Sequence, residues 1–314
     1  MKPRIFIIFL LTVCHSPLSA QSYLASFAKS VGFITFIYKN NPTKQSSGTG
    51  TLILHFTSDT SAQALLVTNR HVLPAKPNEN DSIHFRIRNY DSFVDISIPV
   101  FQKNGSLSDN VKTSPDGEDV AVINVTHLIQ SMGNILEIIR NGATDLLRDS
   151  QLATPDTLKR LNVSIGEDVL FVGYPSLFYD SRNISPILRQ AIIATDPTAD
   201  FYFNNDIRFN YIQKFGEPLP TKLTGFLVDG NLAGGSSGSL VLLKPMGIVS
   251  DPHLGNVIDP RRIQVYILGL STYSYFDIDN RISGPARVNL GGVISSSSIR
   301  NTIALFGFPS YTLH

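Results

Sequence analysis

The 314-residue chain contains no tryptophan, three methionines and one cysteine, Cys14. A single cysteine cannot close a disulfide within the chain, so the fold must be stabilised by its core alone. Charged residues are few, at 16%, and the formal net charge of +1 argues against binding of nucleic acid or an anionic membrane by bulk electrostatics. The seven histidines are scattered, so the sequence indicates neither a metal site nor another cofactor.

Long apolar runs are missing too, since no segment reaches the ~20 apolar residues that a membrane-spanning helix needs. The nearest approach is the N-terminus, where Met1–Arg4 is charged, Ile5–Val13 is apolar and Ser16–Ala20 ends in small residues. This order is typical of a secretory signal peptide. We therefore expect cleavage after Ala20, export to the periplasm or the medium, and a mature chain without cysteine or membrane attachment, which suits a bacterial protein.

From about residue 30 onward, the sequence has the residue pattern of β-strands. Its 42% hydrophobic content is enough for a large core. Runs that are rich in aromatic and branched residues, or that alternate between apolar and polar, predict strands. In the alternating run Ile83–Arg88, His84 falls on the solvent side and is interpreted as a surface histidine. The other runs are Gly32–Tyr38, Gly50–Leu54, Ala64–Val67, Val94–Ile98, Val120–Ile123, Ser164–Pro175, Ile184–Thr195, Phe226–Val228, Leu240–Leu243, Gln264–Ser271 and Gly291–Ile294.

One segment, residues 126–161, breaks the β texture because its apolar residues recur at helical spacing. Within it, Thr154 followed by Pro155 is typical of an N-cap with proline at the first helical position. We interpret this segment as a helical connection between two β units, and Pro245–Arg262 as a surface insertion.

A loop of small residues, Gly234–Ser239, lies between two apolar runs. Its glycines permit backbone angles that let main-chain N–H groups converge on a point near a hydroxyl. A serine nucleophile needs that arrangement, because the oxyanion of an acyl-transfer intermediate must be met by preorganised donors. Alone, such a loop is more typical of a plain turn.

Two upstream residues complete the chemistry that a serine nucleophile needs, namely a base and a group that orients the base. His71 follows the apolar run Ala64–Val67, at the end of an expected strand. Asp119 immediately precedes Val120–Ile123, which reads as a buried strand. A carboxylate is most often a surface residue, but this position next to a buried strand is where an orienting carboxylate would be held.

These motifs together resemble those of the trypsin-like (chymotrypsin-fold) serine protease superfamily in its bacterial, disulfide-free form. Thr68–His71 matches the family's Thr-Ala-Ala-His, Asp119–Ala121 matches Asp-Ile-Ala, and Gly235–Ser239 matches Gly-Asp/Asn-Ser-Gly-Gly/Ser. The chain order His, Asp, Ser is also that of the family and differs from the subtilisin and α/β-hydrolase orders. Weaker matches extend the resemblance over most of residues 30 to 305.

The resemblance implies an all-β fold of two six-stranded antiparallel Greek-key β-barrels, with a helical insertion between them and a C-terminal helix from about Ser296 to Phe306. The implied organisation is a signal peptide (1–20), an N-terminal barrel carrying His71 and Asp119 (21–125), the helical connection (126–161), and a C-terminal barrel carrying Ser237 (162–314).

The implied function is that of a serine endopeptidase acting on a protein or peptide substrate. Ser237 would attack the carbonyl, His71 would take and return the proton, and Asp119 would fix the tautomer of the histidine. The N–H groups of Gly235 and Ser237 would form the oxyanion hole. Two alternatives remain open, a catalytically inactive binding or scaffold protein and an esterase with the same triad. No pattern indicates an oligomeric state.

The resemblance also points to the substrate-binding residues. The residue six before the nucleophile lies at the base of the family's specificity pocket, and here it is Asn231. The pocket-lining strand would contribute Leu270, Ser271 and Tyr273. Such a neutral pocket predicts a preference for small or apolar side chains, since an unpaired buried charge is costly.

Ser236 stands where animal relatives carry an aspartate that pairs with the N-terminal amine freed by activation cleavage. A serine cannot form that ion pair. We therefore expect removal of the leader to be sufficient for activity.

Overall fold

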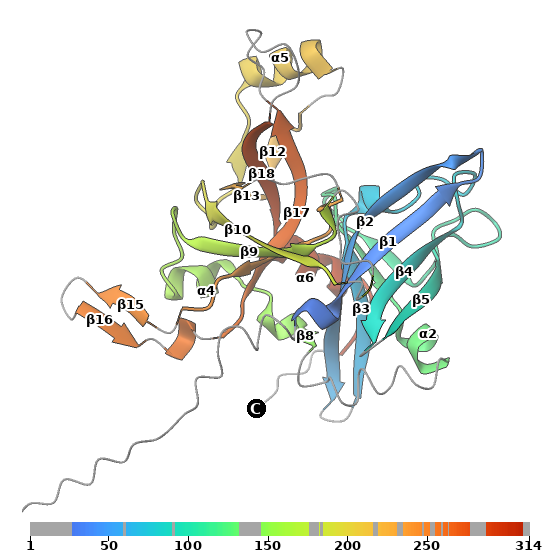
Figure 1. Ribbon diagram of the computed structural model, residues 1–314, viewed down its shortest axis with the longest axis horizontal. Helices are drawn as coiled ribbons and strands as arrows, with labels where there is room; N and C mark the ends of the chain where they lie inside the picture. The colour runs from blue at the N-terminus through green and yellow to red at the C-terminus, as the bar shows by residue number, and fades with distance from the viewer. Residues whose placement is uncertain are drawn as a thin grey trace, which may run out of the picture.

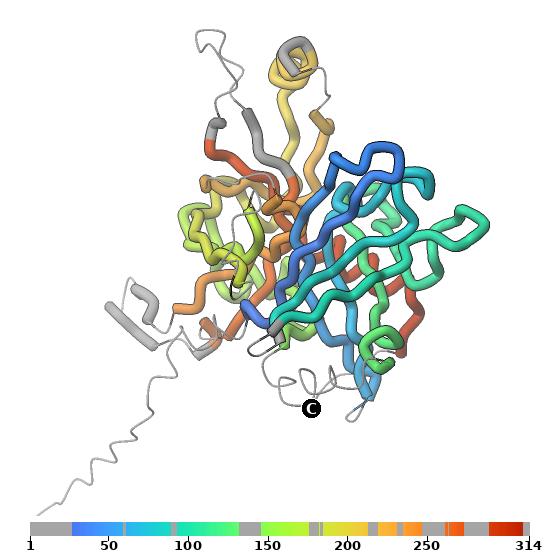
Figure 2. Tube along the Cα trace, turned by 45° about the vertical axis from the view of Figure 1, so that its right-hand side comes forward, coloured from blue at the N-terminus to red at the C-terminus, as the bar shows by residue number. Residues whose placement is uncertain are grey.

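The computed structural model describes residues 27–58, 61–89, 92–131, 146–175, 182, 185–215, 219–230, 235–246, 248–251, 255–258, 260–262, 264–276 and 287–309. The expected leader and Cys14 lie outside these residues. In the part that is described, the chain forms two β units that lie side by side (Figures 1 and 2). Among the described residues, no helix combines the length and the apolar character needed to cross a membrane.

The N-terminal unit is a sheet with the strand order β5-β4-β1-β2-β3-β7-β6, to which β8 adds in parallel beside β2. Alternation fixes its register, since the apolar side chains of Ile83 and Phe85 lie opposite Ile98 and Ile96 and all four are buried. His84, between them, is exposed, as predicted. The strands are β1 (Val31–Tyr38), β2 (Asn41–Ser58), β3 (Ser61–Thr68), β4 (Ser82–Asn89), β5 (Ser92–Pro99), β6 (Val111–Thr113), β7 (Ala121–Asn124) and β8 (Leu147–Arg148).

The C-terminal unit is a closed barrel of six antiparallel strands in the order β10-β13-β18-β17-β14-β9. Its interior is filled by alternate residues of these strands, among them Phe171, Phe226 and Val293. The strands are β9 (Asp168–Gly173), β10 (Ile187–Ile193), β13 (Gly225–Asp229), β14 (Leu240–Leu243), β17 (Ile267–Phe276) and β18 (Arg287–Ser295).

A third apolar cluster joins the two units. In β3, Leu66 points into the N-terminal sheet's own core, whereas Leu65 and Val67 belong to the cluster shared with the C-terminal barrel. The unbroken apolar run Ala64–Val67 is explained by this arrangement, because the strand is covered on both faces. The two units therefore meet over a continuous apolar contact.

Short helices connect and cover the units. The expected N-cap is confirmed at α4 (Pro155–Arg160), where the Thr154 hydroxyl accepts from the N–H of Thr157 at 3.1 Å. The connection also contains α2 (Thr126–Ser131) and the 3-10 helix η2 (Asp149–Gln151), and its residues 132–145 lie outside the described residues.

The expected C-terminal helix is present as α6 (Ser296–Ala304), capped by Ser295. Figure 1 shows it between the two units. It is anchored to the connection, because the hydroxyl of Ser296 donates to the carbonyl of Ala153 and the guanidinium of Arg300 donates to the carbonyl of Leu152 at 2.5 and 3.2 Å.

The structure differs from the expectation in three places. The N-terminal sheet has eight strands instead of six, because it gains the very short β6 and β8. The segment between β10 and β13, for which the sequence analysis predicted no element, contains α5 (Asn205–Phe215) as well as the two-stranded pair β11 (Phe201–Tyr202) and β12 (Lys222–Leu223). The expected insertion after β14 forms a separate hairpin, β15 (Ile248–Asp251) with β16 (Gly255–Ile258), followed by the 3-10 helix η4 (Pro260–Arg262).

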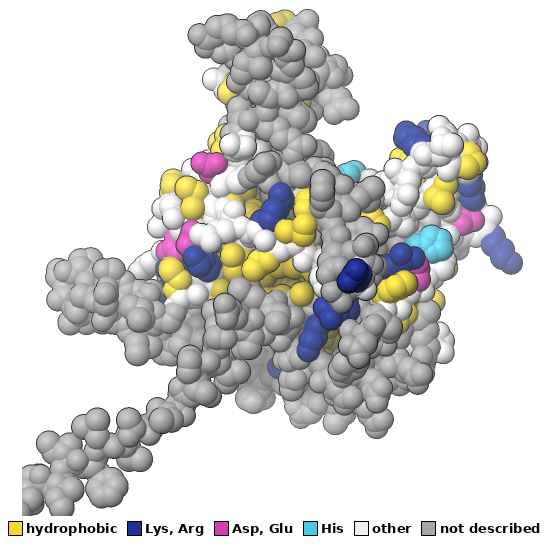
Figure 3. Space-filling view, viewed as in Figure 1, with side chains coloured by type: hydrophobic (Ala, Val, Ile, Leu, Met, Phe, Trp, Pro, Cys, Tyr) yellow, Lys and Arg dark blue, Asp and Glu magenta, His cyan; other side chains and the backbone are white. Residues whose placement is uncertain are grey.

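The face of the molecule in Figure 3 carries scattered Lys and Arg side chains among apolar and acidic ones. This mixed surface fits the low net charge of the sequence.

Candidate active site

His71 and Asp119 come from neighbouring strands of the N-terminal sheet. His71 lies in the 3-10 helix η1 (Arg70–Val72) just after β3, and Asp119 lies just before β7. These strands are paired, with Thr68 opposite Ala121. The end of one strand and the start of the other therefore meet at the same edge of the sheet, although 48 residues separate the two side chains.

The carboxylate of Asp119 holds the imidazole of His71 at two points. Nδ1 of His71 lies 2.5 Å from Oδ2 of Asp119, and the backbone N–H of His71 donates to Oδ1 at 2.9 Å. A carboxylate only accepts hydrogen bonds, so Nδ1 carries the proton and Nε2 is left as a basic nitrogen. The Asp119 side chain is 12% exposed and that of His71 is 44% exposed, so the imidazole is open to solvent while the carboxylate is shielded.

Thr272, in β17 of the other unit, is a further member of the site. Its hydroxyl donates to Oδ2 of Asp119 at 2.8 Å. Asn69 adds a bond from its side-chain amide to the carbonyl of Asp119 at 2.7 Å. The sequence analysis missed both partners. The available signal was the position of each one, since Asn69 lies in the histidine motif and Thr272 lies in the expected pocket-lining strand.

Arg70 brings a positive charge near this carboxylate. Burial lowers the pKa of the Arg70 guanidinium, and the charges of Asp119 and Glu79 oppose that shift. The guanidinium donates to the carbonyl of Pro74 at 3.1 Å, which fixes its position beside the carboxylate of Asp119.

Ser237 lies in the tight loop before β14, where Gly235 and Gly238 have φ angles of +80° and +86°. The loop is held from the N-terminal unit, because the N–H of Thr49 donates to the carbonyl of Ser237 at 2.8 Å and its hydroxyl donates to the carbonyl of Gly235 at 3.0 Å. The hydroxyl of Ser237 donates to the carbonyl of Thr272 at 3.3 Å.

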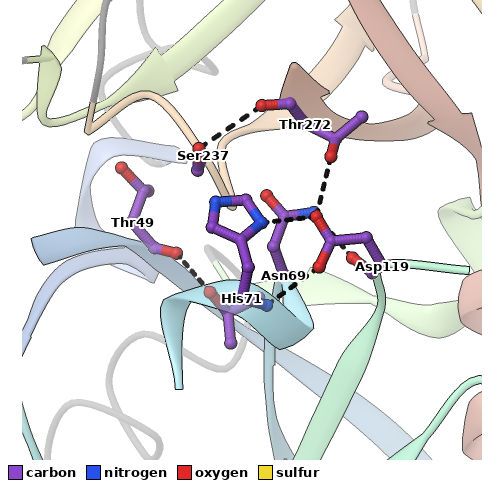
Figure 4. Close-up of polar contacts among 7 residues, drawn as sticks. Thr49, Asn69, His71, Asp119, Ser237 and Thr272 are labelled. Carbon is purple, nitrogen blue, oxygen red and sulfur yellow. Dashed lines mark hydrogen bonds and ion pairs between the residues drawn. The ribbon is translucent and has the colours of Figure 1, made fainter. Parts of the chain in front are cut away.

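Figure 4 shows the imidazole of His71 between Asp119 and Ser237, with its second nitrogen turned toward the serine. The structure thus brings together the three residues that the motifs singled out.

The N–H groups of Gly235 and Ser237 have no acceptor among the hydrogen bonds of the described residues. The two residues flank Ser236 in the loop before β14, where the resemblance places the oxyanion hole.

Of the four residues expected to form the specificity pocket, the structure describes the side chains of two, and both are buried. Leu270 is fully buried in the apolar cluster between the units, so its side chain borders no open pocket. Ser271 is 1% exposed, and its hydroxyl has no hydrogen-bond partner in the part of the chain that is described. It lies opposite Val293, whose side chain points into the barrel. Asn231 and the side chain of Tyr273 lie outside what the structure describes.

The architecture and the site define the class of the fold. Two β units, one a closed six-stranded barrel, are packed together so that a histidine and an aspartate of the first face a serine loop of the second. This is the arrangement of the trypsin-like serine protease fold.

No family model and no curated protein matches the chain. Among solved structures, an HtrA-type protease, AlgW with a tripeptide, aligns over 92% of this chain with 14% identity and a TM-score of 0.49, and the alignment spans 64% of that protein. The inactive form of Rv3671c from M. tuberculosis aligns over 95% of this chain and 96% of its own, with 16% identity and a TM-score of 0.46. The MamO protease domain from Magnetospirillum magneticum aligns over 88% and 97%, with 12% identity and a TM-score of 0.43. At these values the likeness carries nothing about activity or substrate.

Proposed function

We propose that this chain is a serine endopeptidase that hydrolyses peptide bonds through an acyl-enzyme. The observation that carries the proposal is the pair formed by Asp119 and His71, which is buttressed by Thr272 and directed at Ser237. A histidine with Nδ1 held by a shielded carboxylate is a general base aimed through Nε2.

In the first half of the reaction, Oγ of Ser237 forms a bond to the scissile carbonyl carbon while Nε2 of His71 takes the hydroxyl proton. The carbonyl electron pair moves to oxygen, and the N–H groups of Gly235 and Ser237 donate hydrogen bonds to the oxyanion that forms. When this intermediate collapses, the C–N bond breaks and the imidazolium gives its proton to the leaving amine.

In the second half, a water molecule takes the place of the amine. His71 removes a proton from the water as it attacks the acyl carbon, and then returns the proton to Oγ of Ser237. The acid product leaves and the free serine is restored. Asp119 keeps the imidazole in one tautomer and stabilises its positive charge throughout, without taking the proton itself.

The pattern of the leader supports a further part of the proposal. We place the enzyme outside the cytoplasm of a bacterium, with cleavage after Ala20, and we take proteins or peptides as its substrates. The mature chain would start at Gln21. Cell fractionation and N-terminal sequencing of the recovered protein test this part directly.

Covalent labelling by a fluorophosphonate tests the enzymatic proposal. The purified chain is expected to form an adduct on Ser237, while Ser237→Ala forms none and His71→Ala reacts far more slowly. A wild-type chain that folds but takes no label would favour an inactive scaffold. Labelled protein that cleaves simple esters and no peptide in a diverse library would favour the esterase.

The same peptide library tests the expectation of a neutral specificity pocket. The expectation rests on the neutral residues of the sequence, Asn231, Leu270, Ser271 and Tyr273. A strong preference for Arg, Lys, Glu or Asp before the scissile bond would contradict it.

A further inference from the structure

Arg189 contacts the residue that immediately precedes the nucleophile. Its Nη2 donates to the hydroxyl of Ser236 at 2.7 Å. Ser236 is 2% exposed, so this hydroxyl is enclosed by protein and needs a partner. The two residues are 47 positions apart, and the bond ties the barrel wall to the nucleophile loop.

The position of Arg189 in the barrel explains how the guanidinium arrives there. Arg189 lies in β10 directly opposite Phe171 of β9, and Ala191 follows two residues later on the same face. The side chains of Phe171 and Ala191 are part of the barrel's interior cluster. Because cross-strand partners and alternate residues share a face, Arg189 also projects inward, beneath the loop that carries Ser236.

The loop needs a fixed conformation at this point. The carbonyl of Ser236 accepts from the N–H of Ser239 at 2.9 Å, which closes the turn after it. The carbonyls of Gly235 and Ser237, on either side, are both held by Thr49. The hydroxyl of Ser236 is therefore a further contact that fixes the two peptide groups on either side of this residue. The N–H of Ser237 belongs to the peptide group that joins Ser236 to Ser237.

We propose that Arg189 is a positioning residue that acts through Ser236 to aim the N–H of Ser237 at the developing oxyanion. The inference rests on the proposed serine-hydrolase function and deepens it. In this role the guanidinium acts through its hydrogen bond to the hydroxyl of Ser236. A charged donor on an enclosed hydroxyl is stronger than a neutral one, so the loop is held more firmly than a neighbouring amide would hold it.

The test uses three substitutions in the full mature chain. Arg189→Met keeps the apolar stem and removes the donors, Ser236→Ala removes the acceptor, and Arg189→Lys keeps one donor and the charge. We expect the first two to lower kcat about 10- to 100-fold per titrated active site, which is less than loss of a whole oxyanion donor, with little change in KM. The lysine variant should recover part of the loss, since a single acceptor needs a single donor.

A double substitution separates this contact from other effects of Arg189. If the two side chains act through their hydrogen bond, Arg189→Met combined with Ser236→Ala is no slower than Arg189→Met alone. The matched control is Arg262→Met, which breaks a barrel ion pair with Glu167 at 2.8 Å that lies away from the serine loop. It should lower the melting temperature and leave kcat per active site unchanged.

The kinetics of these variants either support or overturn the role of Arg189. An Arg189→Met protein that is folded and has wild-type kcat overturns the inference while the proposed function stands. A Ser236→Ala protein with wild-type kcat overturns it as well, since Arg189 would then act elsewhere. If the wild-type chain itself takes no fluorophosphonate label, the proposed function fails and the inference fails with it.

Discussion

Replacing Gly238 by alanine should destabilise the protein strongly, because two separate costs add at this residue. Gly238 has a φ of +86°, which costs an L-residue about 1–2 kcal/mol. An added Cβ would also lie 2.6 Å from Oγ1 of Thr68 and closer still to the carbonyl oxygen of Thr49. Neither atom can move freely, because the Thr68 hydroxyl donates to that same carbonyl at 2.7 Å. Overpacking of this kind costs about 1–3 kcal/mol.

The expected total is about 3 kcal/mol, which corresponds to a fall in melting temperature of roughly 6–12 °C for a chain of this size. Gly166 provides the matched control, because its φ is +92° and nothing lies within 4 Å of where its Cβ would be. Gly166→Ala should therefore show the backbone cost alone. Thermal unfolding of both variants, followed by circular dichroism, measures the difference. If Gly238→Ala is no less stable than Gly166→Ala, the close approach of the serine loop to Thr49 is refuted.

Three further predictions concern the triad, the barrel surface and maturation. Thr272→Val removes a hydrogen bond to the carboxylate of Asp119 while keeping the side-chain volume; such bonds contribute about 1.5–3 kcal/mol, so kcat/KM should fall at least about tenfold. Lys244→Met should lower the melting temperature at neutral pH and match the wild type in acid. The hydrogen bond from Lys244, at 2.7 Å, and a second from Gln190 hold the pKa of Asp168 below its usual value. The resulting stabilisation is present above the pKa that Asp168 has in the unfolded chain. It is lost as the pH falls through the pKa of Asp168 in the folded protein. A chain purified with Gln21 as its first residue should be active without any further cleavage.

Each of these has an outcome that would contradict it. Unchanged kinetics in Thr272→Val would mean that Asp119 needs no support from the second unit. A Lys244→Met protein that is equally destabilised at all pH values would show that the loss arises from packing instead of ionisation. A chain that becomes active only after a cut within residues 21–35 would overturn the expectation drawn from Ser236.

The proximity of His71, Asp119 and Ser237 could be predicted from the sequence because each residue lies in a short local motif next to an apolar strand. The supporting contacts could not be predicted in this way. The Thr272 hydroxyl reaches Asp119 across 153 residues, and Arg189 reaches Ser236 across 47. Strand pairing brings these side chains together, and the register of that pairing cannot be predicted from a single local motif.

Failures of the fold prediction also have physical causes. The helix α5 was missed because its apolar residues do not gather on one face, and Ile207, Phe209 and Ile212 are exposed while Tyr211 is buried. The strands β6 and β8 are three and two residues long, which is too short for alternation to be recognised. Leu270 was assigned to the pocket by its place in the strand, but the side chain turns to the apolar contact between the units.

The two units hold each other's functional residues, and this explains why the site depends on their packing. The N-terminal unit holds the nucleophile loop through Thr49, whose N–H donates to the carbonyl of Ser237. The C-terminal unit holds the orienting carboxylate through Thr272, whose hydroxyl donates to Asp119. Neither unit alone contains a complete site. The apolar cluster between them therefore does more than stabilise the fold, because a shift of one unit against the other would lengthen both bonds at once and separate the base from the nucleophile.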